Sequence, residues 1–332
     1  MRAMVLEQTA PIETSPLRSM QVDDPWPQDG EIRLRVTHSA VCRTDLEIVE
    51  GQRAKKKLPL IPGHQMVGIV DKLGKNTRRF KVGDRVGCPW LRSTCGTCQY
   101  CAAGAENLCD GIRFNGYHQD GGYADFCLVP ENFAHELPVE LESKIIAPLL
   151  CAGSIGDRTL KKSGLVKGMT LGIFGFGGAA HLTMQFARAR GARVFVISRG
   201  AGHRAFAEKM GADWVGDSPY SLPRKLDTAI LFASSGEMIP SILSSLKKGG
   251  SLGVVGLDIQ AVPALNFEKE LSYEKTLYTV TACTRRDTVE CLSEAVTAGV
   301  KPQIALYPLA EANQALLDLK AERVNGCAVL EM

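Results

Sequence analysis

The sequence contains no run of eighteen apolar residues and no long block of like charge. The first absence excludes an ordinary membrane-spanning helix. The second argues against nucleic acid as a partner, since 39 basic and 36 acidic residues leave a net charge of only +3. The N-terminal segment MRAMVLEQTA also lacks the long apolar core of a secretory signal. We therefore expect a cytoplasmic protein that binds neither membranes nor nucleic acid.

The chain has 332 residues, of which 11 are cysteine. This length exceeds that of one ordinary hydrophobic core, so two domains are expected. In a reducing compartment, cysteines serve as metal ligands and buried thiols more often than as disulfides. The spacing of the cysteines is therefore informative.

Four cysteines lie in one short segment with the spacing C-x2-C-x2-C-x7-C, at Cys95, Cys98, Cys101 and Cys109. Thiolate is a soft ligand that zinc prefers, and four thiolates complete a tetrahedral shell with no open position. A closed shell stabilises structure and does no chemistry. The spacing predicts a structural zinc lobe over about residues 92–110.

The pattern of residues changes near position 150. Before it, segments such as EIRLRVTHSAV, MVGIVDKLG and GYADFCLVP are typical of β-strands. After it, LGIFGFGGAAHLTMQFARARGARVFVISR reads as a strand, a glycine-rich turn, a helix and a second strand, and two more strand-like segments follow. We expect an α/β protein with a β-rich domain (1–148 plus 276–332) interrupted by a doubly wound parallel sheet (149–275).

The turn from Gly175 to Ala180 fits the pattern G-x-G-x-x-A between a strand and a helix, the context that confirms this dinucleotide-binding motif. Gly175 permits a tight turn, Gly177 lets backbone amides approach a pyrophosphate, and Ala180 allows close helix packing. The predicted cofactor contacts here are Gly175, Gly177, Gly178 and Ala180. A purely structural glycine turn is the alternative.

The second strand of this unit ends in Ser198 and Arg199, with Arg204 close behind. Enzymes that prefer NAD usually place an acid there, which binds the ribose hydroxyls and repels a 2′-phosphate. Because this chain has cations in place of the acid, we expect NADP(H) to be preferred over NAD(H), with Ser198 and Arg199 contacting the 2′-phosphate and Arg204 as a further candidate. The alternative is that Arg199 is an ordinary surface residue and that the cofactor is NAD.

The strings AVCRTDLEIVEG, PLIPGHQMVG and RFKVGDRVGCPW, together with the four-cysteine lobe and GFGGAAH, resemble the zinc-dependent medium-chain alcohol dehydrogenases. The similarity spans nearly the whole chain and leans toward the bacterial and cinnamyl alcohol dehydrogenase-like branch. It implies a GroES-like catalytic domain, a Rossmann cofactor domain and hydride transfer between NAD(P)H and an alcohol–carbonyl pair at zinc. It also implies a homodimer and a small primary alcohol or aldehyde as substrate.

By this resemblance, Cys42, His64 and Cys151 match the ligands of a catalytic zinc, which gives two zinc ions per chain. Two thiolates and an imidazole leave one coordination position open for substrate. Thr44 matches a hydroxyl that contacts the substrate oxygen, and Trp90 and Leu91 match the lining of the substrate pocket. Ordinary core packing is the alternative for Trp90 and Leu91.

The chain departs from the family pattern at three positions. Gln65 follows the zinc histidine where a glutamate is usual, and the loss of that charge should make the zinc more electrophilic. Glu47 stands where a relay histidine is usual, and an exposed carboxylate is a weaker base near neutrality than imidazole. Asn325 lies where relatives often have a phosphate-binding arginine, which Arg323 can replace.

These departures keep two alternatives open. One is an NADPH-binding protein with diminished activity; the other is a zinc-independent quinone or enoyl reductase of the same superfamily. Zinc content, turnover of aldehydes and reduction of activated alkenes distinguish them.

Overall fold

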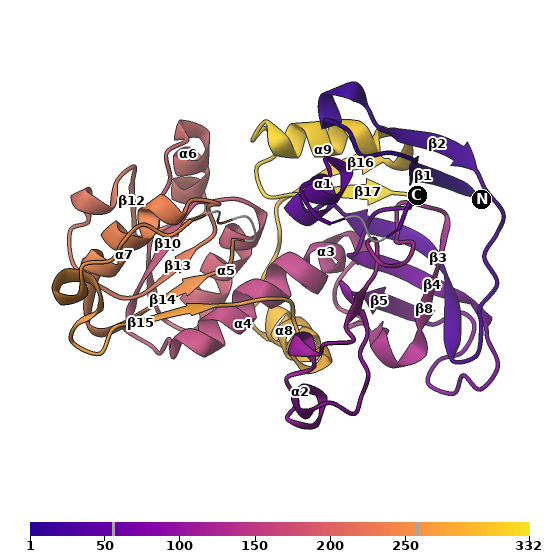
Figure 1. Cartoon of the computed structure of the whole chain (residues 1–332), viewed down its shortest axis with the longest axis horizontal. Coiled ribbons are helices and arrows are strands. Elements are labelled where there is room, and N and C mark those ends of the chain that lie inside the picture. Colours follow the sequence, from indigo (N-terminus) through magenta and orange to yellow (C-terminus); the bar gives the residue numbers. More distant parts are fainter. Residues whose placement is uncertain (55–56, 257–258, 260) are drawn as a thin grey trace. The chain divides into compact units, whose positions relative to one another are not determined.

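The computed structural model describes residues 1–54, 57–256, 259 and 261–332, which divide into two compact units (Figure 1). Unit 1 comprises 1–154, 282–296 and 301–332, and unit 2 comprises 155–281 and 297–300. Unit 1 is therefore interrupted in sequence by unit 2.

Unit 1 is built on a seven-stranded sheet in the order β16-β17-β3-β4-β5-β9, with β8 paired to β3. Alternating apolar residues such as Leu34 and Val36 of β3 are buried, as expected for a strand that covers a core. The strands of this unit are β1 (Arg2–Leu6), β2 (Leu17–Gln21), β3 (Glu31–Ala40), β4 (Met66–Leu73), β5 (Arg85–Cys88), β6 (Leu91–Ser93), β7 (Arg113–Phe114), β8 (Phe126–Pro130), β9 (His135–Glu136), β16 (Ile304–Pro308) and β17 (Cys327–Glu331). Its helices are α1 (Arg43–Val49), α2 (Gln99–Ala102), α3 (Ser143–Pro148), most of α8 (Arg285–Thr297) and α9 (Ala312–Lys320).

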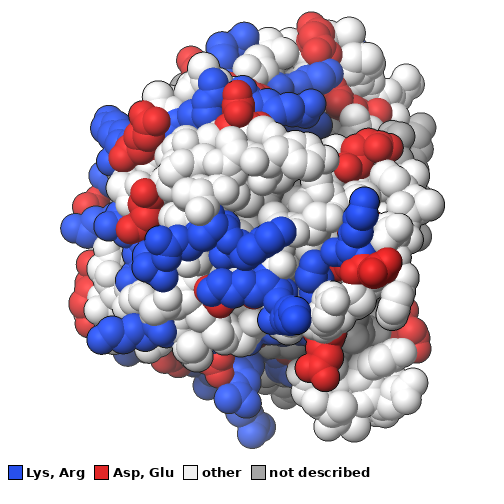
Figure 2. All heavy atoms as spheres, turned by 90° about the vertical axis from the view of Figure 1, so that its left-hand side faces the viewer, with Lys and Arg blue, Asp and Glu red and all other residues white. Residues whose placement is uncertain are grey.

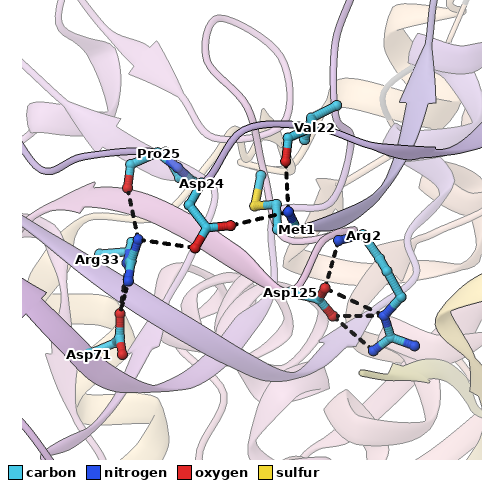
Figure 3. A network of polar contacts seen from close by, with 8 residues as sticks. All are labelled: Met1, Arg2, Val22, Asp24, Pro25, Arg33, Asp71 and Asp125. Atoms are coloured by element: carbon cyan, nitrogen blue, oxygen red, sulfur yellow. Dashed lines mark hydrogen bonds and ion pairs between the residues drawn. The ribbon is translucent and has the colours of Figure 1, made fainter.

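A polar network fastens the N-terminal strands to this sheet (Figure 3). The buried guanidinium of Arg33 on β3 pairs with Asp71, at 2.7 Å from Nε, and lies 3.6 Å from a carboxylate oxygen of Asp24. Asp24 also accepts from the amino group of Met1 at 3.1 Å. A buried charge is tolerated only when it is paired in this way, and the network ties the segment at Asp24 to β3 and to the amino group of Met1.

Unit 2 contains a six-stranded, wholly parallel sheet in the order β12-β11-β10-β13-β14-β15. This order reverses beside β10, as in doubly wound nucleotide-binding sheets. Its strands are β10 (Thr170–Phe174), β11 (Arg193–Ile197), β12 (Trp214–Gly216), β13 (Leu226–Leu231), β14 (Leu246–Val254) and β15 (Thr276–Thr279), and its helices are α4 (Ser154–Ser163), α5 (Gly178–Ala189), α6 (Ala201–Lys209) and α7 (Ile239–Ser245). The expected α/β fold with a parallel doubly wound sheet is confirmed.

Strand β15 differs from the expectation that residues from 276 onward return to the first domain. It pairs in parallel with β14, from Ser251 with Thr276 to Val254 with Thr279. The chain rejoins unit 1 at Ala282, six residues later than expected. A four-residue strand carries no signal for the sheet to which it belongs, because that depends on its pairing partner.

Figure 2 views the side on which Figure 1 draws unit 2, and basic side chains gather there among scattered acidic ones. Several lysines of this unit serve the fold: Lys247 pairs with Asp227 at 2.7 Å, and Lys275 donates to the carbonyl of Leu243 at 2.8 Å. Within the described part of the chain, every helix is too short or too polar to cross a membrane.

Candidate functional site: two thiol clusters and a dinucleotide turn

The four cysteines of the predicted lobe converge, and their sulfur atoms all lie within 4.8 Å of one another. Cys98 caps the short helix α2, and its backbone N–H donates to the sulfur of Cys95 at 3.3 Å. Backbone N–H groups of Thr97 and Cys98 hold the pKa of Cys95 down to about 6. Thiolate character and convergence both fit a closed zinc shell.

Glu106, within the same lobe, fastens it to the start of α8. Its carboxylate accepts from the backbone N–H of Arg285 at 2.8 Å and from the Arg285 guanidinium at 2.7 Å. Burial alone would raise the pKa of Glu106, but the hydrogen bonds from Arg285 lower it. The lobe is thus tied to the rest of unit 1 by a charge-assisted pair as well as by the backbone.

Cys42, His64 and Cys151 form a second cluster inside unit 1, and their ligand atoms also lie within 4.8 Å of one another. Cys42 is the N-cap of α1, His64 lies in the loop just before β4, and Cys151 lies in a π-helical turn at Leu149–Gly153. Turns of this kind are frequent at functional sites. Three segments far apart in sequence therefore deliver three ligand groups to one point.

Asp45 supports this second cluster, and sequence reasoning missed it. One carboxylate oxygen contacts Nδ1 of His64 at 2.8 Å, and the other accepts from the backbone N–H of Cys42 at 3.0 Å and from the Tyr123 hydroxyl at 3.2 Å. A carboxylate behind a ligating histidine fixes the ring orientation and raises its basicity. Its sequence signal was the capping-box spacing, three residues after Cys42.

The electrostatics of the cluster favour a cation. Burial would lower the pKa of His64, but the Asp45 carboxylate and the Cys42 sulfur raise it to about 10. A hydrogen bond with Cys151 lowers the pKa of Cys42 well below its usual value, and the same contact raises the pKa of Cys151. Nε2 of His64 is buried and has no hydrogen-bond partner among the described residues. A soft donor set of two sulfurs and an orphaned imidazole nitrogen fits zinc, which would displace the remaining protons.

Thr44 and Glu47 follow Cys42 on α1, and both are buried. We expected an exposed carboxylate at Glu47, but only 3% of this residue is exposed. Burial raises its pKa, and the guanidinium of Arg53, whose Nε lies 2.9 Å away, opposes that rise. The position of the usual relay histidine is therefore occupied by a buried ion pair. Sequence reasoning did not identify Arg53, because no motif marks it.

Gln65 is buried next to His64 and contacts the segments that carry Cys42 and Cys151. Its side-chain N–H donates to the carbonyl of Ala40 at 3.4 Å, and its oxygen accepts from the backbone N–H of Ala152 at 3.5 Å. Ala152 directly follows Cys151. A glutamate here can accept from Ala152 but cannot donate to Ala40.

Trp90 lies beside the second cluster. Its ring centroid is 5.8 Å from that of His64, and it stacks on Phe114 at 3.9 Å. Leu91 is the first residue of β6 and is 2% exposed. The structure thus places Trp90 against His64 and Leu91 in the adjoining core.

The glycine-rich turn of unit 2 joins β10 to α5. Gly175 has φ of +86°, and a Cβ there would lie 3.0 Å from the backbone nitrogen of Ala233, so only glycine fits without strain. A Cβ at Gly177, the N-cap of α5, would meet no atom within 4 Å. Gly178 begins the helix and Ala180 is buried. Open space at the start of a helix is what a phosphate group requires.

Beyond β11, Ser198 is buried and Arg199 is exposed. Nη1 of Arg204 donates to the carbonyls of Ser198 and Arg199, at 2.9 and 2.6 Å. Arg204 therefore braces the loop, and Arg199 is the cation that this loop presents to solvent. In unit 1, Arg323 pairs with Asp318 at 2.7 Å, so its guanidinium already has an anionic partner.

Comparisons with known proteins agree with the fold described above. Residues 28–139 match the alcohol dehydrogenase GroES-like domain, and residues 178–298 match the zinc-binding dehydrogenase domain. The chain is 41% identical to a probable alcohol dehydrogenase, AdhA, of Mycobacterium tuberculosis over 99% of its own length and 97% of the relative's.

Solved structures show the same fold. A cinnamyl alcohol dehydrogenase of Sorghum bicolor superposes with a TM-score of 0.91 and 26% identity, over 99% of this chain and 97% of that one. CAD of Helicobacter pylori complexed with NADP(H) superposes with a TM-score of 0.90 and 23% identity, over 100% of this chain and 99% of that one. The chain is an oxidoreductase that belongs to the zinc-binding, medium-chain alcohol dehydrogenase family.

Proposed function

We propose that this enzyme transfers hydride reversibly between NADP(H) and a primary alcohol–aldehyde pair, at a zinc ion held by Cys42, His64 and Cys151. The observation that supports the proposal is the convergence of these three ligand atoms within 4.8 Å, with His64 oriented by Asp45. When bound there, zinc supplies a Lewis acid that polarises a carbonyl and lowers the pKa of an alcohol.

The chain's own residues supply positioning and proton transfer in this proposal. The Thr44 hydroxyl orients the substrate oxygen and passes its proton on, and Glu47 receives that proton. Gln65 keeps the segments of Cys42 and Cys151 in register through Ala40 and Ala152. Trp90 forms the apolar wall beside His64, and Leu91 backs it.

In unit 2, the amides after Gly175 and Gly177 bind the cofactor pyrophosphate, with Gly178 at the helix start and Ala180 packed beneath. Ser198 and Arg199 bind the 2′-phosphate of NADP(H), while Arg204 holds their loop in shape. The exposure of Arg199 and the lack of an acid at this strand end support the preference for NADP(H) over NAD(H).

We further propose a structural zinc at Cys95, Cys98, Cys101 and Cys109, hence two zinc ions per chain. The two thiol clusters favour a reducing compartment, the cytoplasm. A homodimer joined along the edge strand β15 agrees with the unpaired outer edge of that strand among the described residues.

The first test is the zinc content of protein purified without chelators, followed by kinetics with aliphatic and aromatic aldehydes. Two zinc ions per chain and a higher kcat/KM with NADPH than with NADH are expected. Preference for NADH would contradict the cofactor assignment. One zinc per chain with reduction of activated alkenes would favour the zinc-independent reductase, and NADPH binding without turnover would favour a sensor.

A further inference from the structure

Arg53 is a partly buried cation beside the second cluster. Only part of its guanidinium makes polar contacts with the described residues. Its side chain is 22% exposed, and Nε lies 2.9 Å from a carboxylate oxygen of Glu47. Among the described residues, neither terminal nitrogen of the guanidinium has a hydrogen-bond or ion-pair partner. A guanidinium offers five N–H donors, so one bond to Glu47 leaves its outer fork open.

The guanidinium also lies against the aromatic wall of the proposed substrate site. Its central carbon is 5.6 Å from the Trp90 ring centroid, and that ring is 5.8 Å from His64. The same indole ring therefore neighbours both the cation and a proposed zinc ligand. The indole N–H of Trp90 is buried and also lacks an acceptor among the residues that the structure describes. The open fork of Arg53 makes this wall suited to an acceptor-rich group.

Arg53 also lines a small pocket, together with Lys57, Tyr117 and apolar side chains that include Ile48 and Leu60. Lys57 is paired with Asp120, and the Tyr117 hydroxyl donates to the carbonyl of Ala54 at 2.7 Å. Within the described lining, Arg53 is thus the charged group left to meet a ligand.

We propose that Arg53 binds an anionic group on the substrate, so that the enzyme prefers aldehydes and alcohols that carry a carboxylate over neutral ones of equal length. This inference rests on the proposed function, because it concerns specificity at the same site. A guanidinium fork binds a carboxylate through two parallel N–H bonds. Arg53 is a specificity residue here, and the Glu47 carboxylate fixes its orientation by holding Nε.

The test compares 4-oxobutanoate with butanal, and 5-oxopentanoate with pentanal, using the zinc-loaded enzyme and NADPH. We expect kcat/KM for the charged aldehyde to exceed that for the neutral one by about tenfold or more, the size of one charge-assisted bond. In Arg53→Gln this ratio should fall toward one. Arg53→Lys, which keeps the charge but loses the guanidinium fork, should retain part of the preference for the charged aldehyde. Any effect transmitted through Glu47 to proton transfer would alter both aldehydes and cancel in the ratio.

Arg18→Gln is the matched control, because this arginine is 74% exposed and paired with Glu7, and its loss should leave the ratio unchanged. Raising the salt concentration should increase KM for the oxoacid more than for butanal. Equal kcat/KM for the charged and neutral aldehydes, or an unchanged ratio in Arg53→Gln, would overturn the inference.

A binding measurement separates this inference from the proposed reaction. Succinamate and butyramide resemble the two aldehydes but cannot be reduced, and calorimetry can compare their affinities. Tighter binding of succinamate that is lost in Arg53→Gln supports the anion site even if no aldehyde is reduced with either cofactor, an outcome that would reject the proposed function alone. Equal affinities for the two amides would reject the anion site itself.

Discussion

The two thiol clusters of unit 1 differ in how the chain assembles them. The lobe takes its four cysteines from one segment, 95–109, and its members range from exposed to buried. The second cluster gathers Cys42, His64 and Cys151 from three segments, and its histidine is fully buried and contacts a buried carboxylate. One cluster depends on a local loop and the other on the whole fold of the unit.

This difference has a chemical consequence. Four thiolates saturate a tetrahedral ion, whereas two thiolates and an imidazole leave a position for substrate. The lobe is tied to the fold by Glu106 and Arg285, while the buried polar residues Asp45, Glu47 and Gln65 lie near the second cluster. We therefore expect substitutions in the first to affect stability and substitutions in the second to affect chemistry.

The largest effect is expected from Cys151→Ser. Zinc content should fall from two ions to one, and kcat/KM should fall by about a thousandfold or more, because Lewis-acid stabilisation is worth several kcal/mol. Metal analysis and steady-state kinetics measure both. Cys291→Ser is the control, since its buried thiol lies near Leu149 and belongs to neither cluster. Two zinc ions retained in Cys151→Ser would refute the assignment of this ligand.

Cys98→Ser should have the opposite profile. It should also lose one zinc, but with a drop of about 4 kcal/mol in the free energy of unfolding, since a structural metal contributes directly to folding. Any fully folded fraction should keep kcat/KM close to the wild-type value. Denaturant unfolding together with kinetics at low temperature checks this. If Cys98→Ser kept its full stability but lost activity, the lobe would be the catalytic cluster and the assignment made here would be wrong.

Asp45→Asn should weaken the second cluster alone. Loss of the carboxylate behind His64 is expected to reduce metal affinity or activity by about 10- to 100-fold. Competition with a chelator should release one zinc early and leave the lobe zinc bound. Asp120→Asn removes a nearby acid that accepts from the backbone N–H of Ile61, and it should leave zinc affinity unchanged. Equal release from both variants would show that Asp45 has no special role.

The smallest effect is expected from Glu47→His, which restores the usual relay side chain. A base acts only when deprotonated, and the ordinary pKa of histidine is about two units above that of glutamate. Burial raises the pKa of Glu47 itself, which makes the difference from the pKa of a histidine smaller. The acid limb of the pH profile of turnover should therefore move to higher pH by about one unit. An unmoved profile would mean that protons leave by a route without residue 47.

The lobe and the glycine-rich turn could be predicted from spacing because each is encoded within about fifteen residues. The second cluster could not be derived in that way, since its three side chains come from positions 42, 64 and 151, and only the family resemblance grouped them. Asp45 and Arg53 were missed for a related reason. Their importance comes from contacts with His64 and Glu47, and an isolated acid or arginine has no distinctive pattern.

The expectation that Glu47 is exposed was wrong; it was made because a carboxylate on a short helix is usually exposed. The Arg53 partner makes burial tolerable, and nothing in the local sequence indicates that pairing. Strand β15 was misplaced on similar grounds. Its alternation of residues predicts a strand, but its membership in the parallel sheet is decided by β14.

Strand β17 lies beside β3 in unit 1, with Val329 opposite Ala40. During synthesis, every strand of unit 2 leaves the ribosome before residues 327–331 do. The edge of β3 that leads into Cys42 therefore has no partner until residues 327–331 have been made. Domains usually finish folding in the order in which they are made. Here unit 1, whose first strands are made before unit 2, is completed after it. A chain truncated near residue 300 would contain every described strand of the parallel sheet, whereas unit 1 would still lack β16, β17 and α9.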